Sequence, residues 1–161
     1  MLFRSKLAID HAKMPEQRAW LKADLARRQT LILHNLGVWS HYVGDASQPM
    51  HVSIHFNGWG DWPNPKDYTQ DRSLHARFEG EFVRQNASAD RVAAAIAAPV
   101  DCKCTIETYS LTYLKATLAQ IEPLYALEQA GGFKPSDARG KAFVTARLAA
   151  GSTSLRDMVT M

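Results

Sequence analysis

The chain has 161 residues, of which 46% are hydrophobic and 22% are charged, and its formal net charge is +3. This composition is ordinary for a soluble globular protein with a hydrophobic core, so we expect one domain over residues 1–161. Two cysteines exclude a disulfide framework. No apolar run approaches the ~20 residues that a membrane-spanning helix needs. The start of the chain lacks the apolar segment and cleavage site of a signal peptide.

The first half of the chain predicts one long helix followed by a turn and a loop. Pro15 suits a first helical position. Residues 16–45 are mostly good helix formers with a rough apolar stripe. Pro49 ends this helix, because the residue before a proline is pushed away from helical angles. Residues 57–65 are rich in glycine, proline and asparagine, and they predict a loop.

The second half also predicts helices. One begins near Asp71 or Ser73 and extends to about residue 84, and a short alanine-rich helix spans residues 89–98. After a cysteine-containing loop we expect one long helix over residues 105–129, kinked at Pro123 and ended by a glycine pair. Residues 135–150 and 153–161 predict two more helices. No period-two strand pattern and no repeat occurs, so the predicted fold class is all-α.

The cysteines Cys102 and Cys104 are separated by a single residue. Zinc-binding cysteine pairs usually have two or more residues between them. We therefore expect either two ordinary thiols or one local bridge.

Two pairs of a histidine and a carboxylate dominate the chemistry of the sequence. His41 and Asp45 are four residues apart, and so are His75 and Glu79. Residues at i and i+4 stand on one face of a helix, one turn apart, so each pair can offer two ligands to one metal ion. His51 follows the Pro49 turn and can reach either pair. Zinc takes three or four such nitrogen and oxygen ligands, so the pattern predicts a zinc site.

The neighbours of these pairs favour the same interpretation. Trp39, Tyr42, Val43, Phe78 and Phe82 are apolar or aromatic, and they indicate that the helices are buried where the ligands lie. A buried carboxylate without a partner is costly, and a cation removes that cost.

Other residues near these pairs are candidates for contacts with a substrate. His55 follows His51 by four residues and is a ligand, a support for a ligand, a substrate contact or an ordinary loop histidine. Trp59 and Trp62 stand in the predicted loop, and Tyr68 follows it. These three aromatic residues form the lip of a cleft, where they insert at a lipid surface or stack on a base, or they simply pack the loop onto the helices.

The sequence His-Tyr-x-Gly-Asp-x-x-Gln-Pro-Met-His at residues 41–51, followed by His-x-x-x-Glu at residues 75–79, resembles the zinc-dependent phospholipase C and S1/P1 nuclease superfamily. That family is an all-α, secreted group whose trinuclear zinc site cleaves phosphodiesters. The resemblance is strong over residues 41–79 and loose in the surrounding helices. It implies a helical bundle of the phospholipase C/P1 nuclease type and a secreted or periplasmic location.

The resemblance also assigns roles to individual residues. His51, His75 and Glu79 look like the three protein ligands of one zinc ion. His41 and Asp45 look like part of a second zinc site, and Asp45 is expected to bridge to a third ion and to be catalytic. In the family, an N-terminal tryptophan, two histidines and an aspartate complete the other sites. We expect that this chain begins after that segment, so that one zinc site is complete here.

Three functions follow from these expectations. The first is a zinc phosphodiesterase of the phospholipase C type, since Glu79 matches the phospholipase branch of the family. The nuclease branch usually has aspartate at this position. The second is a single-strand nuclease of the S1/P1 type, with a nucleic-acid substrate in place of a phospholipid. The third is a truncated, non-catalytic zinc-binding scaffold, held together as a homo-oligomer.

Overall fold

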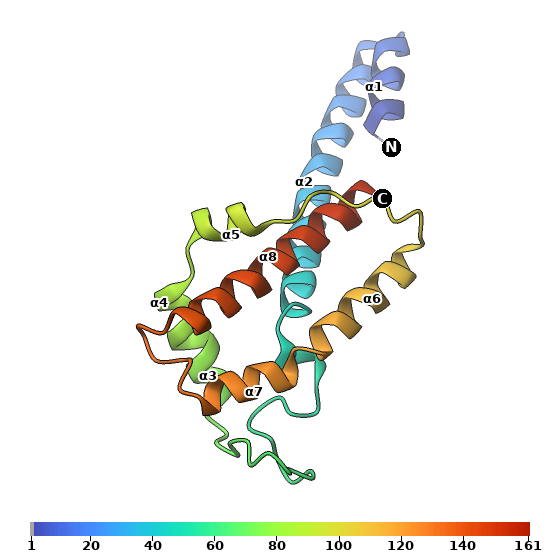
Figure 1. The fold of residues 1–161 in the computed structure, drawn as a ribbon. Helices are drawn as coiled ribbons and strands as arrows, with labels where there is room; N and C mark the ends of the chain where they lie inside the picture. Colours follow the sequence, from blue (N-terminus) through green and yellow to red (C-terminus); the bar gives the residue numbers. More distant parts are fainter. Residues whose placement is uncertain (1) are drawn as a thin grey trace. The chain divides into compact units, whose positions relative to one another are not determined.

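The computed structural model describes residues 2–161, and Figure 1 shows that they form helices joined by loops. No strand occurs among these residues, which confirms the all-α class. The helical segments are α1 (Leu2–His11), α2 (Pro15–Asp45), the 3₁₀ turn η1 (Pro49–Val52), α3 (Leu74–Ala76), the π-helical segment η2 (Arg77–Val83), α4 (Arg84–Asn86), α5 (Ala89–Ala95), α6 (Ile106–Leu118), α7 (Ile121–Gln129) and α8 (Ala138–Thr160). Within the described chain, none of the helices is both long and apolar enough to cross a membrane.

The described residues divide into two compact units, one up to His41 and one from Tyr42 to Met161. Helix α2 begins in the first unit and ends in the second. It starts at Pro15 and ends at Asp45, as the sequence predicts. The expectation of one domain over residues 1–161 stays a prediction.

The first unit consists of α1 and most of α2. Ile9 and Ala12 are buried in it. The guanidinium of Arg18 donates to the backbone oxygen of Ala12 at 3.0 Å, which fastens the turn between the two helices. Within α2 the Asp24 carboxylate accepts hydrogen bonds from Arg28 and Arg27, and these two cations lower its pKa.

The second unit contains the main hydrophobic core. Its buried members come from η1, the loop that follows, the α3–η2 segment, α7 and α8: Met50, Trp59, Tyr68, Leu74, Phe78, Phe82, Ile121, Leu124, Tyr125 and Val144. A smaller cluster joins the end of α2 to α6 and α8 through Val43, Tyr113 and Met158. In this cluster the Tyr113 hydroxyl donates to the backbone oxygen of Val43 at 2.8 Å. Helix α5 packs along α8.

Burial around the histidine–carboxylate pairs is only partly as expected. Val43, Phe78 and Phe82 are buried. Trp39 and Tyr42 are not, since they are 36% and 67% exposed. The prediction was wrong for these two residues, and of this stretch Val43 is the one that packs in the small cluster with Tyr113 and Met158.

The predicted helix over residues 105–129 is two helices. Helix α6 begins after Thr105, whose hydroxyl accepts from the backbone N–H of Thr108 at 3.3 Å, and α7 begins at Ile121. The break falls at Ala119 and Gln120, before Pro123 rather than at it. A proline clashes with the carbonyl four residues earlier, so the helix turns at residue 119, and Pro123 then lies in the first turn of α7, where its missing N–H costs nothing.

The two helices predicted at the C-terminal end are one helix, α8. Gly151 lies inside it and is buried. A Cβ at Gly151 would lie 3.3 Å from the Cβ of Ser47 and 3.7 Å from the Cα of Gly44. The glycine therefore allows α8 to lie close to the end of α2, and this tertiary contact is the reason that a glycine stands inside the helix.

The remaining differences are local. Helix α5 ends at Ala95, three residues before the predicted end at residue 98. Cys102 and Cys104 form a disulfide, which is the local bridge among the two expected alternatives. Lys103 between them has φ 45°, the left-handed conformation that this tight loop requires.

Gly140 gives a test of the packing at the start of α8. A Cβ at Gly140 would lie 2.0 Å from the backbone oxygen of Gly132 and 2.6 Å from Cζ of Phe82. Gly140→Ala is therefore expected to destabilise the protein by about 2 kcal/mol or more, although alanine favours a helix. Gly37→Ala, with no neighbouring atom within 4 Å, is expected to stabilise it by about 0.5–1 kcal/mol. Urea denaturation followed by circular dichroism measures both, and equal effects would contradict the packing.

Candidate metal centre

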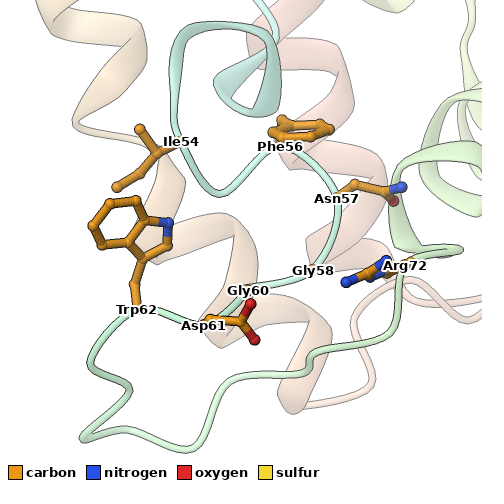
Figure 2. Close-up of a pocket in the computed structure, with 8 residues that line it drawn as sticks. All are labelled: Ile54, Phe56, Asn57, Gly58, Gly60, Asp61, Trp62 and Arg72. Carbon is orange, nitrogen blue, oxygen red and sulfur yellow. The ribbon is translucent and has the colours of Figure 1, made fainter.

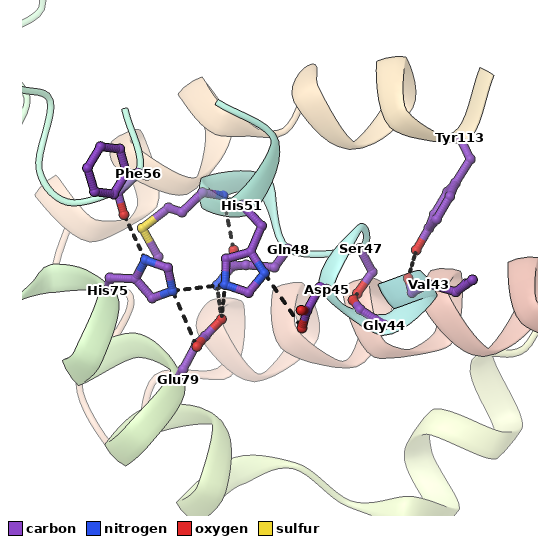
Figure 3. A network of polar contacts seen from close by, with 11 residues as sticks. Val43, Gly44, Asp45, Ser47, Gln48, His51, Phe56, His75, Glu79 and Tyr113 are labelled. Carbon is purple, nitrogen blue, oxygen red and sulfur yellow. Dashed lines mark hydrogen bonds and ion pairs between the residues drawn. The ribbon is translucent and has the colours of Figure 1, made fainter. Parts of the chain in front are cut away.

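Three predicted ligands converge on one point in the second unit. The Nε2 atoms of His51 and His75 lie 3.1 Å apart. The Glu79 carboxylate lies 3.2 Å from the first and 3.3 Å from the second (Figure 3). Tetrahedral zinc with bonds of about 2 Å separates its ligand atoms by about 3.3 Å. The His51, His75 and Glu79 group can therefore hold a metal ion.

Each ligand comes from a short segment anchored in the core. His51 belongs to η1, whose first two residues, Pro49 and Met50, are buried. The side-chain oxygen of Gln48 caps this turn by accepting from the backbone N–H of Met50 at 3.2 Å. The amide nitrogen of the same Gln48 donates to Glu79 Oε1 at 3.1 Å. One side chain therefore fixes the turn that carries His51 and orients the carboxylate opposite it.

Glu79 lies in the π-helical segment η2, which the sequence pattern did not predict. The helix begins at α3, just after Ser73, close to one of the two predicted starts. It widens at Arg77–Val83, where Phe78 and Phe82 are buried against Phe133. The buried rings fix the rotation of the segment, and Glu79 then faces the two histidines. Single π-helical turns inside α-helices are frequent at functional sites.

The second ring nitrogen of each histidine also has a partner. His75 Nδ1 donates to the backbone oxygen of Phe56 at 2.8 Å. Because a carbonyl oxygen only accepts, His75 Nδ1 carries a proton, and Nε2 faces the other two ligands. His51 Nδ1 lies 3.7 Å from the Asp45 carboxylate. Such partners behind a histidine set its tautomer and orient it toward a metal ion.

The centre is open on one side. The side chains of His51, His75 and Glu79 are 28%, 24% and 40% exposed. Three protein ligands with an accessible fourth position are the arrangement of catalytic zinc sites, whereas structural zinc sites are closed by four protein ligands.

The two predicted ligands on α2 lie outside this group. Asp45 contacts the back of His51, and its side chain is 43% exposed. His41 is the last residue of the first unit. A second zinc ion on His41 and Asp45, and a catalytic role for Asp45, stay predictions.

The predicted substrate contacts occupy two different environments. Trp59 is 7% exposed, and its indole N–H donates to the backbone oxygen of Pro63 at 2.9 Å. His55 stacks on Trp59 with ring centroids 3.7 Å apart, and its Nδ1 contacts the Trp59 carbonyl at 2.7 Å. Trp62 is 54% exposed. The structure gives His55 and Trp59 a packing role, and contacts of all three residues with a substrate stay predictions.

A pocket of about 530 Å³ is formed by the loop after η1 (Figure 2), and Phe56 in its lining also contacts the metal centre. Its lining includes apolar side chains, Ile54, Phe56 and Trp62, and two opposite charges, Asp61 and Arg72. Phe56 connects the two sites, since its side chain lines the pocket and its backbone oxygen holds His75. The sequence reasoning missed Phe56, Gln48 and Arg72. Gln48 stands in the quoted motif, but a backbone carbonyl such as that of Phe56 leaves no residue-type signal.

No protein-family model matches this chain, and no curated protein or solved structure matches it. The family assignment therefore stays a proposal that rests on the motif and the site.

The metal centre predicts a ranking of zinc affinities. His75→Ala and Glu79→Gln each remove a ligand and are expected to abolish tight binding of one zinc ion. Gln48→Ala leaves all three ligands in place but frees Glu79, so zinc affinity should fall about tenfold to hundredfold. His11→Ala, an exposed histidine at the end of α1, is the matched control and should bind zinc normally. Isothermal titration calorimetry measures these affinities, and unchanged binding in His75→Ala would exclude this centre.

Because Tyr125 is buried, we expect the folded protein to lose stability at high pH. Its hydroxyl donates to the backbone oxygen of His55 at 2.8 Å, and burial raises its pKa to about 12. An unfolded tyrosine has a pKa of about 10. The folded state therefore holds this proton more tightly, and the stabilisation present below pH ~10 is lost as the pH rises toward ~12. Tyr125→Phe should flatten the pH dependence of the free energy of unfolding in this range, whereas Tyr42→Phe, at a 67% exposed position, should not.

Proposed function

We propose that this chain is a zinc-dependent phosphodiester hydrolase of the phospholipase C type. The observation that carries the proposal is the convergence of His51, His75 and Glu79, at ligand spacing, around a position open to solvent. A zinc ion held there supplies Lewis acidity toward a phosphoryl oxygen and makes water a better nucleophile. The helical bundle of the phospholipase C/P1 nuclease type belongs to the same proposal.

The residues of the chain supply the positioning. The backbone oxygen of Phe56 holds the His75 imidazole and Gln48 holds the Glu79 carboxylate, while the Asp45 carboxylate lies 3.7 Å behind His51. This arrangement keeps the ligand atoms in place before a metal ion or a substrate arrives, so little reorganisation is needed. The pocket beside His75 receives the organic group of the substrate.

A secreted or periplasmic location is also part of this proposal. The disulfide between Cys102 and Cys104 supports it, since disulfides persist in oxidising compartments.

A single-strand nuclease of the S1/P1 type is the second candidate. The exposed indole of Trp62 at the pocket that Phe56 also lines favours it, because nucleobases stack on such rings. Both candidates use the same metal ligands and differ in what the pocket binds.

Parallel assays of the zinc-loaded chain test the proposal. Phosphatidylcholine in mixed micelles, oligo(dT) and the soluble diester bis(p-nitrophenyl) phosphate are the substrates, each with and without EDTA. Phosphatidylcholine should be cleaved only with zinc, and His75→Ala should lower the rate at least ~100-fold, while His11→Ala should not change it. Cleavage of oligo(dT) alone would establish the nuclease. Zinc binding without cleavage of any diester would indicate a non-catalytic scaffold. Analytical sedimentation would then measure its oligomeric state.

A further inference from the structure

The loop after η1 exposes three large apolar side chains around one pocket. Ile54 and Phe56 are each 60% exposed, and Trp62 is 54% exposed. All three line the pocket beside the metal centre. Figure 2 shows Trp62 and Ile54 together on one side of it and Phe56 at its edge. We call Ile54, Phe56 and Trp62 the apolar rim.

The loop that carries the apolar rim is fixed in one conformation by hydrogen bonds within the loop. The backbone N–H of Trp59 donates to Thr69 at 2.8 Å, and Asn64 bonds both backbone groups of Tyr68. Gly58 has φ 78°, and a Cβ there would lie 2.7 Å from the backbone oxygen of Gln70. The buried rings of Trp59 and Tyr68 pack the loop onto the core, so the side chains of the apolar rim are exposed to solvent in a fixed arrangement. A preformed surface loses little conformational entropy when it binds.

The charge of this loop decides between possible partners. Between residues 53 and 72 the acidic side chains are Asp61, Asp67 and Asp71, and the basic ones are Lys66 and Arg72. Lys66 is paired with Glu122, and Asp71 with Arg77. Single-stranded nucleic acids and anionic membranes are recognised by clusters of basic residues. A loop with slightly more acid than base matches neither of them.

The combination of side chains fits a zwitterionic phospholipid surface. Tryptophan and phenylalanine favour the boundary between headgroups and acyl chains, and apolar side chains bury their exposed area there. Asp61 and Arg72 stand at the same pocket with opposite charges. They can face the ammonium and the phosphate of neighbouring headgroups, whose net charge is zero.

We propose that the apolar rim docks the metal centre onto the surface of a zwitterionic phospholipid bilayer. This inference rests on the proposed phosphodiesterase function and assigns the surface that the enzyme uses to reach its substrate. Phe56 contributes twice, because its ring belongs to the rim and its carbonyl orients His75 at 2.8 Å. Docking therefore places the headgroup layer next to the metal ligands.

Vesicle binding tests the proposal without depending on catalysis. The full chain is mixed with sucrose-loaded dioleoylphosphatidylcholine vesicles in EDTA, where no lipid is cleaved, and the bound fraction is sedimented. Phe56→Ser/Trp62→Ser is expected to lower the partition coefficient about tenfold or more, since two half-exposed apolar side chains are lost from the contact. The control is Leu111→Ser/Leu114→Ser, which removes apolar side chains that are 53% and 39% exposed on α6. The control should bind vesicles as well as the unchanged chain, and circular dichroism verifies that each variant is folded.

Fluorescence gives an independent measurement. Brominated phosphatidylcholine should quench a part of the tryptophan emission, and Trp62→Phe should remove that part. Trp39→Phe, at a 36% exposed position on α2, should retain it. Quenching that survives Trp62→Phe would contradict docking by the rim.

Several outcomes would overturn the inference. They are equal vesicle binding by the rim variant and the unchanged chain, binding that needs anionic phosphatidylglycerol, and binding to oligo(dT) that the rim variant loses. Failure of the proposed function has a different result, because vesicle binding through the rim would then persist while the zinc-loaded chain cleaves no diester.

Discussion

The close approach of three electron-rich atoms is the constraint on which the rest of the second unit depends. Two imidazole nitrogens and a carboxylate lie 3.1–3.3 Å apart, which is the spacing of ligand atoms around one small cation. This spacing depends on the groups that contact each ligand from behind. Phe56 and Gln48 hydrogen-bond His75 and Glu79 and restrict their rotation, and the Asp45 carboxylate lies 3.7 Å from His51.

The ligands come from separate parts of the chain, and the hydrophobic core connects them. Met50 and Pro49 anchor the turn that carries His51. Phe78 and Phe82 anchor the π-helical segment that carries Glu79. Because interiors are close-packed, a change of one ring shifts the segments that surround the ligands. The core is therefore part of the metal centre in a physical sense, since it sets the ligand spacing.

The aromatic side chains of the loop after η1 have two different roles. Trp59 and Tyr68 are buried, and with the stacked His55 they fix the loop on the core. Phe56 and Trp62 face solvent around the pocket. A rigid base with an exposed apolar edge suits an enzyme whose substrate lies in a surface, since the loop retains its shape on contact. The nearly neutral charge of the loop favours a zwitterionic surface over a polyanion.

The sequence by itself determined the local features: the all-α class, the helix start at Pro15, and the spacing that places His75 and Glu79 on one side of a helix. These follow from neighbouring residues, because helix propensity, capping and i, i+4 spacing act within a few turns. The tertiary structure decided which groups meet. It placed Asp45 behind His51, retained Gly151 within α8, widened the helix at Glu79 and turned a backbone carbonyl of Phe56 toward His75. The approach of Gly151 to Ser47 joins residues far apart in the chain, and the contact of His75 with Phe56 uses a backbone atom, so neither leaves a pattern in the order of residue types. Asp45 and His51 are close in the chain, but the turn at Pro49 lies between them, so helical spacing does not say how they meet.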